Sequence, residues 1–205
     1  DHQLQDPQLR HRAQAFQGEI MRILLHVCCG PCALYPVQQL RLLNHEVTGF
    51  FHNPNIHPYK EFRRRLETLK DMAAAINLVL EVDDHYGLKD FLRRVVFQEE
   101  QRCRHCYAMR LGQVAHLAAA GHYDAFSTTL LYSRYQNHQA LREQGEAFAQ
   151  QVGVPFYYED FRTGWQQGID ESVRMGLYRQ PYCGCIFSEQ ERYDKQLRKN
   201  RVTSG

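Results

Sequence analysis

The chain has 205 residues, a length that suits one domain or one domain with a small appendage. Its 25 basic and 23 acidic side chains give a formal net charge of +2, which excludes a strongly basic protein that wraps nucleic acid but allows a local basic patch. Hydrophobic residues at 43% and charged residues at 23% exclude a disordered chain, and no apolar run approaches the roughly 20 residues that cross a bilayer.

The N-terminal region differs in composition from the rest. Residues 1–20 are polar and rich in glutamine, and we expect them to form a flexible extension to a single α/β catalytic domain over residues 21–205. They lack the apolar stretch of a secretory signal peptide, so the expected compartment is the reducing cytoplasm. The first predicted strand covers residues 22–27, and Pro31 then opens a helix predicted at 33–44.

Strands and helices alternate along the rest of the chain. Short apolar runs bounded by turn residues predict further strands at 46–51, 78–82, 125–131 and 155–158. Apolar residues at helical spacing predict helices at 59–76, 88–97, after Cys106, 139–152 and, interrupted by a loop at 178–184, 165–200. This alternation predicts an α/β fold: a mostly parallel, Rossmann-like sheet with helices on both faces and a C-terminal helical segment.

Histidines and arginines are less informative than the fold pattern. His26, inside the first strand, is expected to be a core histidine, whereas His52 and His57 have either a structural role or that of a proton donor. The run 63–65 consists of three arginines on a predicted helix, and such a run usually faces solvent. The basic group at 102–105 borders a cysteine pair and is more suggestive of function.

The seven cysteines fall into three short groups: Cys28, Cys29 and Cys32; Cys103 and Cys106; Cys183 and Cys185. Metals and sulfur–sulfur bonds need sulfurs within a few ångströms of each other, so this grouping predicts metal ligands or redox pairs. The first group directly follows the first strand, and sites in open α/β sheets form at the carboxyl ends of the strands.

Cys29-Gly-Pro-Cys32, between a strand and a helix, is typical of a thioredoxin-like active site. A thiol–disulfide oxidoreductase that uses Cys29 and Cys32 is therefore an alternative hypothesis. Cys28 beside the motif, the two further cysteine pairs and the repeated strand–helix units disfavour it.

The other cysteine pairs favour metal chemistry. Cys103 and Cys106, together with Cys28 and Cys29, provide four thiolates, which suit Zn²⁺ or a [4Fe–4S] cluster. Adjacent cysteines diverge too much to share one ion easily, which gives a weak preference for the several irons of a cluster. The 183–185 pair, with its central glycine, can form a strained disulfide, bind a metal or consist of two buried thiols.

These motifs resemble those of the epoxyqueuosine reductase QueH family over about residues 21–195. The resemblance rests on several motifs in one order: HVCCGPC (26–32), FFHNPNIHP (50–58), RCRHCYAMRL (102–111), STTLLYSRYQNH (127–138), EDFRTG (159–164) and GLYRQPYCGCIFS (176–188). It implies an enzyme that removes the epoxide oxygen of epoxyqueuosine in tRNA with two electrons and two protons, the final step of queuosine biosynthesis.

The resemblance also implies cofactors and partners. It implies a [4Fe–4S] cluster on four ligands, Cys28, Cys29, Cys103 and Cys106. It implies a redox-active pair, Cys183 and Cys185, and an additional iron ion, for which Cys32, Cys183 and Cys185 are the candidate ligands. The same three cysteines are the candidate catalytic residues. The expected partners are tRNA with epoxyqueuosine in its anticodon loop and an unidentified electron donor, and no membrane is expected.

Overall fold

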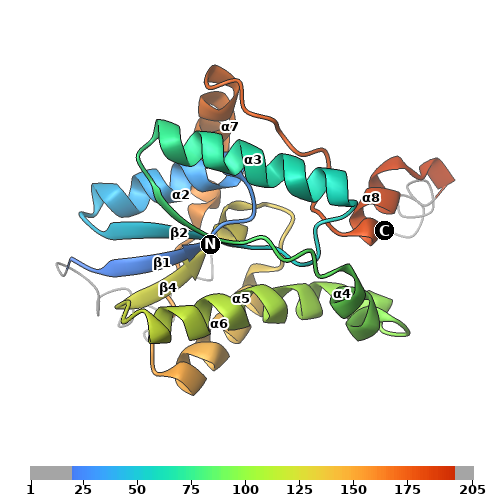
Figure 1. Cartoon of the computed structure of the whole chain (residues 1–205), viewed down its shortest axis with the longest axis horizontal. Helices are drawn as coiled ribbons and strands as arrows, with labels where there is room; N and C mark the ends of the chain where they lie inside the picture. The colour runs from blue at the N-terminus through green and yellow to red at the C-terminus, as the bar shows by residue number, and fades with distance from the viewer. Residues whose placement is uncertain (1–19, 197–205) are drawn as a thin grey trace, which may run out of the picture.

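The computed structural model describes residues 20–196, and within them four strands form one parallel sheet in the order β3-β2-β1-β4 (Figure 1). The strands are β1 (Arg22–His26), β2 (Glu46–His52), β3 (Val79–Asp83) and β4 (Ala125–Thr128). This is the strand order with which a Rossmann sheet begins, so the predicted α/β fold is confirmed. The extension predicted at 1–20 lies, apart from Ile20, outside the described residues, and the single-domain assignment stays a prediction.

Helices cover both faces of the sheet, as predicted. They are α2 (Gly30–Leu42), α3 (Tyr59–Ala75), α4 (Leu88–Val95), α5 (Arg102–Ala120), α6 (His138–Val152), α7 (Trp165–Arg174) and α8 (Ile186–Tyr193). Helix α2 packs against α3 and α7 on one face, and α5 packs against α6 on the other (Figure 1). Helices that could span a membrane are lacking from the part of the chain that the structure describes.

The fourth strand and the predicted fifth strand are shorter than the sequence indicates. β4 ends at Thr128, whose hydroxyl accepts a 3.1 Å hydrogen bond from the Leu130 backbone, and a 3₁₀ helix follows over Thr129–Tyr132. The prediction of a strand at 155–158 is wrong, because this segment forms only an isolated bridge, between Phe156 and Phe126. Pro155 has no N–H to donate, so the pairing cannot extend to the N-terminal side of Phe156, and on the other side the Tyr157 carbonyl accepts a 2.8 Å hydrogen bond from the Ser127 hydroxyl.

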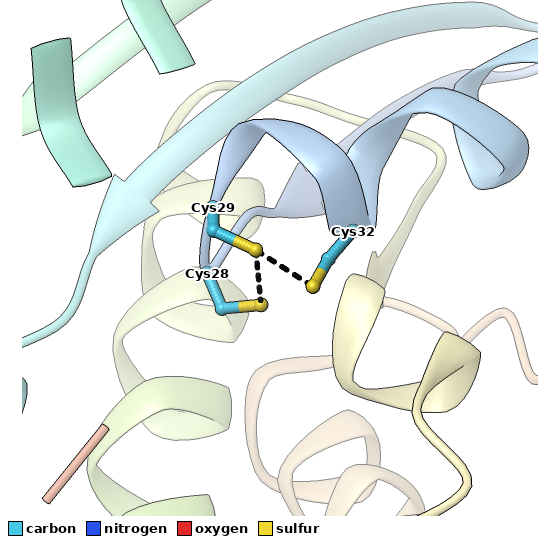
Figure 2. A group of neighbouring side chains, drawn as sticks. All are labelled: Cys28, Cys29 and Cys32. Atoms are coloured by element: carbon cyan, nitrogen blue, oxygen red, sulfur yellow. Dashed lines mark hydrogen bonds between the residues drawn. The ribbon is translucent and has the colours of Figure 1, made fainter. Parts of the chain in front are cut away.

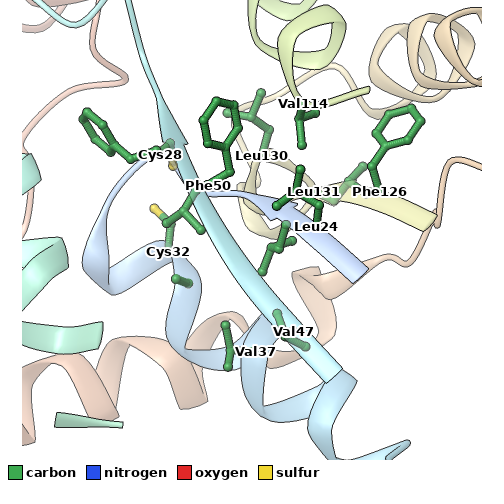
Figure 3. Packing of buried hydrophobic residues seen from close by; sticks show 14 of the residues in the cluster. Leu24, Cys28, Cys32, Val37, Val47, Phe50, Val114, Phe126, Leu130 and Leu131 are labelled. Atoms are coloured by element: carbon green, nitrogen blue, oxygen red, sulfur yellow. The ribbon is translucent and has the colours of Figure 1, made fainter. Parts of the chain in front are cut away.

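The hydrophobic core lies between the sheet and both helix layers. Fully or almost fully buried side chains from strands and helices meet there, among them Leu24, Phe50, Val114, Phe126 and Leu131 (Figure 3). Burying one side chain of this size contributes about 1.5–3 kcal/mol to folding. Cys28 and Cys32 belong to the same buried cluster, so the first cysteine group lies where the core ends.

His26 ties three strands together inside this core. Its Nδ1 lies 2.9 Å from the hydroxyl oxygen of Thr128 on β4, and its Nε2 lies 3.2 Å from the carbonyl oxygen of His52 on β2. Both ring nitrogens therefore have partners, and the prediction of a core histidine is confirmed. Burial lowers the pKa of His26 to about 3, so the ring is neutral.

Candidate metal and redox centre

The sulfurs of Cys28, Cys29 and Cys32 point toward one another at the carboxyl end of β1 (Figure 2). The Cys29 Sγ lies 3.8 Å from that of Cys28 and 2.6 Å from that of Cys32. Over residues 20–196, these cysteines are the single group of three His, Cys, Asp or Glu side chains whose ligand atoms all lie within 4.8 Å of one another. The structure thus keeps together the first cysteine group of the sequence analysis, and Cys32, which the resemblance also pairs with Cys183 and Cys185, lies at its edge toward the C-terminal loop that carries Gln180.

The start of α2 explains this grouping. The helix was predicted to begin at residue 33 but begins at Gly30, so Cys29 is its N-cap and Cys32 lies in its first turn. A helix N-terminus stabilises a nearby negative charge and therefore favours thiolate ligands.

The three buried sulfurs share negative charge unequally. Hydrogen bonding with Cys29 and Cys32 lowers the pKa of the Cys28 thiol well below its usual range. Burial raises the pKa of Cys29 well above its usual range, and interaction with the Cys28 sulfur raises that of Cys32. The group therefore carries one negative charge easily, and a bound cation would be needed to deprotonate all three thiols.

Gln180 reaches this group from the C-terminal loop. Its Nε2 donates hydrogen bonds of 3.0 Å to the Cys29 Sγ and 3.1 Å to the Cys32 Sγ. Donors to ligating sulfurs orient a metal site and tune its electronic properties. The sequence analysis missed Gln180, and its only signal was its position three residues before Cys183.

Cys103 and Cys106 lie in the first turns of α5, whereas the sequence analysis placed them before a helix. The 3₁₀ turn Glu99–Gln101 leads directly into α5, so the helix begins one residue before Cys103. Burial, together with negative charge at Cys183, raises the pKa of Cys106 to about 12. Burial and the charge of Cys183 also raise the pKa of Cys103, so these sulfurs share one electrostatic neighbourhood.

The buried guanidinium of Arg110, on α5, acts on all three cysteine groups. Its Nε donates a 2.9 Å hydrogen bond to the Asn55 Oδ1 in the loop after β2. Its positive charge adds to the hydrogen bonds that lower the pKa of Cys28, and it opposes the burial that raises the pKa values of Cys106 and Cys183. The three groups therefore lie around one fixed positive charge.

Arg65 is buried, which corrects the expectation that the arginine run at 63–65 faces solvent. Only 1% of Arg65 is exposed. Its Nη1 donates to the Cys183 carbonyl at 2.8 Å and its Nη2 to the Tyr182 carbonyl at 3.0 Å, while its Nε donates to the Glu61 Oε1 at 2.7 Å. With 3.6 residues per turn, residue 65 falls on the apolar face of α3. The helical spacing of the apolar residues therefore predicts its burial, but the sequence analysis treated the three arginines as one solvent-facing run.

His57 holds the other side of the C-terminal loop. Its backbone N–H donates to the Gly184 carbonyl at 2.8 Å, and its Nδ1 accepts a 3.3 Å hydrogen bond from the Ile186 N–H. Its ring packs against Tyr86 and Phe91, and burial lowers its pKa to about 4. His57 is therefore neutral and holds the loop in place, which is the structural alternative of the sequence analysis.

Comparison with known proteins identifies one family. A family model described as "Epoxyqueuosine reductase QueH" matches residues 23–191. The protein of that name from Dehalococcoides mccartyi is 37% identical over 174 residues, which cover 85% of this chain and 96% of its own. The one from Thermotoga maritima is 32% identical over 190 residues, covering 87% and 96%.

A solved structure of an NH3-dependent NAD synthetase from Campylobacter jejuni matches 96% of this chain and 91% of its own, at 14% identity and a TM-score of 0.38. That similarity is too low to add to what the strand order already shows.

Proposed function

The chain belongs to the epoxyqueuosine reductase QueH family, and from this premise we propose how its cysteines perform the reaction. The protein is an oxidoreductase that deoxygenates epoxyqueuosine in tRNA to queuosine, the final step of queuosine biosynthesis. Two electrons and two protons enter, both carbon–oxygen bonds of the epoxide break, a carbon–carbon double bond forms, and the oxygen leaves as water.

The proposed ligands of a [4Fe–4S] cluster are Cys28, Cys29, Cys103 and Cys106. The proposed site of an additional iron ion comprises Cys32, Cys183 and Cys185. The donor set fits these groups, because the sulfurs are soft ligands that iron accepts and several of them are buried at the carboxyl end of the sheet. Such a cluster supplies single electrons at low potential when it is bound.

The observation that carries this proposal is the contact of the C-terminal loop with the first cysteine group. Gln180 donates to the sulfurs of Cys29 and Cys32, and Cys183 follows three residues later in the same loop. This contact, between residues 151 positions apart, supports a proposed redox pair that lies close to the proposed metal ligands.

The remaining site residues supply charge and order. Arg65 and Arg110 are buried cations that offset the negative charge of several thiolates. Cys183 and Cys185 are less enclosed than the first group, which suits a pair that meets the substrate. We propose that this pair acts in the redox step, either as iron ligands or through a disulfide.

The proposed macromolecular partner is tRNA. Its modified nucleoside lies in the single-stranded anticodon loop, where a base can be splayed out without melting a duplex. Because tRNA is the substrate, we place the reaction in the cytoplasm. An electron donor, not yet identified, completes the reaction.

The test begins with anaerobic purification. We expect a brown protein that contains iron and inorganic sulfide. Nucleoside analysis of the treated tRNA should show that epoxyqueuosine is converted to queuosine. Cys103→Ser should lose the inorganic sulfide and the absorption of the cluster. Cys32→Ser should keep both, but it should lose the additional iron ion and the activity. A colourless protein with stoichiometric zinc and no sulfide would refute the cluster.

Nothing in residues 20–196 favours the thiol–disulfide oxidoreductase alternative. A catalytic thiol must be accessible and readily ionised, but Cys29 is only 1% exposed and burial raises its pKa. The alternative predicts disulfide reductase activity that survives Cys103→Ser and disappears in Cys32→Ser, and we expect no such activity.

A further inference from the structure

We propose that Tyr132, Arg134, Tyr135 and Trp165 form a stacking platform for a nucleobase that flanks the modified nucleoside of the tRNA. We call these four residues the aromatic wall. This inference rests on the proposed function, because it names the part of the protein that holds the anticodon loop beside the three cysteine groups. We call these three groups the sulfur centre.

The rings of the wall are packed in a defined order. Tyr132 stacks on Trp165 with ring centroids 5.2 Å apart and planes at 26°, and its hydroxyl donates to the Trp165 carbonyl at 2.7 Å. Tyr135 meets the same indole edge-on, with centroids 5.9 Å apart at 79°. The Arg134 guanidinium lies over the indole, 5.5 Å from its centroid.

The wall adjoins the sulfur centre at two points. Gln136, the residue after Tyr135, donates a 3.2 Å hydrogen bond from its Nε2 to the Cys183 Sγ. At the other end, burial and the negative charge of Cys32 raise the pKa of Tyr132, which places this ring near the first cysteine group. A base stacked on the wall therefore lies next to the site where the modified base must react.

The backbone that presents Tyr135 is well held. The Tyr135 N–H donates to the Ser133 Oγ at 3.2 Å, and the Asn137 N–H donates to the Tyr107 hydroxyl at 3.1 Å. That hydroxyl donates in turn to the Gln136 Oε1 at 2.9 Å. The segment is thus ordered in advance, which lowers the entropic cost of binding.

Tyr135 nevertheless projects into solvent. Its residue surface is 84% exposed and Arg134 beside it is also exposed, whereas Tyr132 is buried and Trp165 is half-buried. An exposed aromatic ring beside a cationic guanidinium is what single-stranded nucleic acid requires, because bases stack on the ring and the cation attracts the phosphates. These two features favour RNA over a protein as the occupant.

The test uses the anaerobically purified protein and an anticodon stem-loop RNA with guanosine at the wobble position, so that no turnover occurs. The chain has one tryptophan, so its fluorescence reports on the wall directly. We expect RNA to change the Trp165 emission. Tyr135→Ala should weaken binding, measured by anisotropy of labelled RNA, about 5- to 100-fold, while Tyr135→Phe, which keeps the ring, should bind almost as the wild type does.

Two further variants separate stacking from charge. Arg134→Gln should lower the slope of log K against log salt by about one, whereas Tyr135→Ala should leave that slope unchanged. Phe97→Ala removes another exposed ring, 94% exposed, and should bind RNA as the wild type does.

The proposal is overturned if Tyr135→Ala binds RNA with wild-type affinity, or if Phe97→Ala weakens binding equally. If Tyr135→Ala keeps the wild-type affinity for RNA but receives electrons from the donor more slowly, the wall binds a protein partner instead. A wild-type protein that binds the RNA through Tyr135 but never reduces epoxyqueuosine would refute the proposed function and leave the platform standing.

Discussion

The guanidinium of Arg65 donates a 2.8 Å hydrogen bond to the carbonyl oxygen of Cys183, which lies 118 residues later in the chain. Its second terminal nitrogen donates to the Tyr182 carbonyl, and Glu61 fixes it from one turn earlier on α3. The Tyr178 hydroxyl donates to the other carboxylate oxygen of Glu61 at 2.7 Å. One buried ion pair therefore sets where the proposed redox pair lies.

Replacing Arg65 should destabilise the fold far more than replacing its neighbour Arg63. Arg65→Met leaves Glu61 buried without its cation, a loss of about 3–5 kcal/mol. Arg63 makes a solvent-exposed pair with Glu67, one turn further along the same helix, so Arg63→Met should cost about 0.3–0.5 kcal/mol. Urea unfolding of the two variants gives the comparison, and equal midpoints would contradict the assigned role.

Arg65→Lys tests positioning apart from stability. Lysine keeps the charge but cannot donate in the fork geometry that reaches Cys183, Tyr182 and Glu61 together. We expect the variant to fold, with kcat reduced by up to roughly 100-fold and KM changed little, because the loop is misplaced while the RNA surface is intact. Faster alkylation of Cys183 in the metal-free protein should accompany this loss. Normal alkylation with reduced activity would point to another cause.

Gln180→Leu should weaken iron retention. The change removes both hydrogen bonds to the Cys29 and Cys32 sulfurs, and loss of a partner of this kind typically costs about 10- to 100-fold in metal affinity or activity. Iron per chain is measured after dialysis against graded chelator concentrations. Gln139→Leu, which removes an exposed amide bonded to Glu143, is the matched control and should retain iron normally. Equal retention in both variants would exclude the role of Gln180.

The regular elements could be predicted because their patterns are local. Apolar residues at helical spacing placed a helix at 59–76, and α3 covers Tyr59–Ala75. The strand predicted at 155–158 reduces to one bridge at Phe156, because Pro155 before it cannot donate to a ladder and the Tyr157 carbonyl after it accepts from the Ser127 hydroxyl. A pattern of side chains predicts burial, whereas a strand also needs backbone partners.

The site was only partly predictable for a related reason. Cysteine spacing grouped Cys28, Cys29 and Cys32, but it did not reveal that α2 begins at Gly30 and makes Cys29 its N-cap. Gln180 lies in a polar loop with no periodicity, so only the tertiary fold brings it to the sulfurs. Long-range contacts of this kind carry no local sequence signal.

Gly168→Ala should disturb the aromatic wall. A methyl group at this position of α7 would overlap the hydroxyl oxygen of Tyr132, which is bonded to the Trp165 carbonyl. Overpacking of this kind costs about 1–3 kcal/mol. We expect a lower melting temperature together with a shifted Trp165 emission, whereas Gln167→Ala, on the exposed side of the same helix, should change neither. An unaltered emission spectrum in Gly168→Ala would show that Tyr132 moves aside freely.

The stability of the protein should fall in mild acid because His57 is buried in its neutral form. Burial and the positive charge of Arg110 lower its pKa to about 4, while the unfolded chain has a histidine pKa of about 6.5. Between these values the unfolded state binds the extra proton, so the contribution of His57 is complete above pH 6.5 and is lost as the pH falls toward 4. A proton on Nδ1 would also oppose the Ile186 N–H that this atom accepts.

His57→Asn isolates this effect, because the asparagine oxygen can still accept from Ile186 but does not titrate. The variant should be less stable at every pH, since it leaves space between Tyr86 and Phe91. Its unfolding free energy should nevertheless vary less with pH: between pH 7 and pH 5 the wild type should lose about 2 kcal/mol more than the variant does. Urea titrations at the two pH values measure this difference. Parallel losses in both proteins would mean that another buried group is responsible for the acid sensitivity.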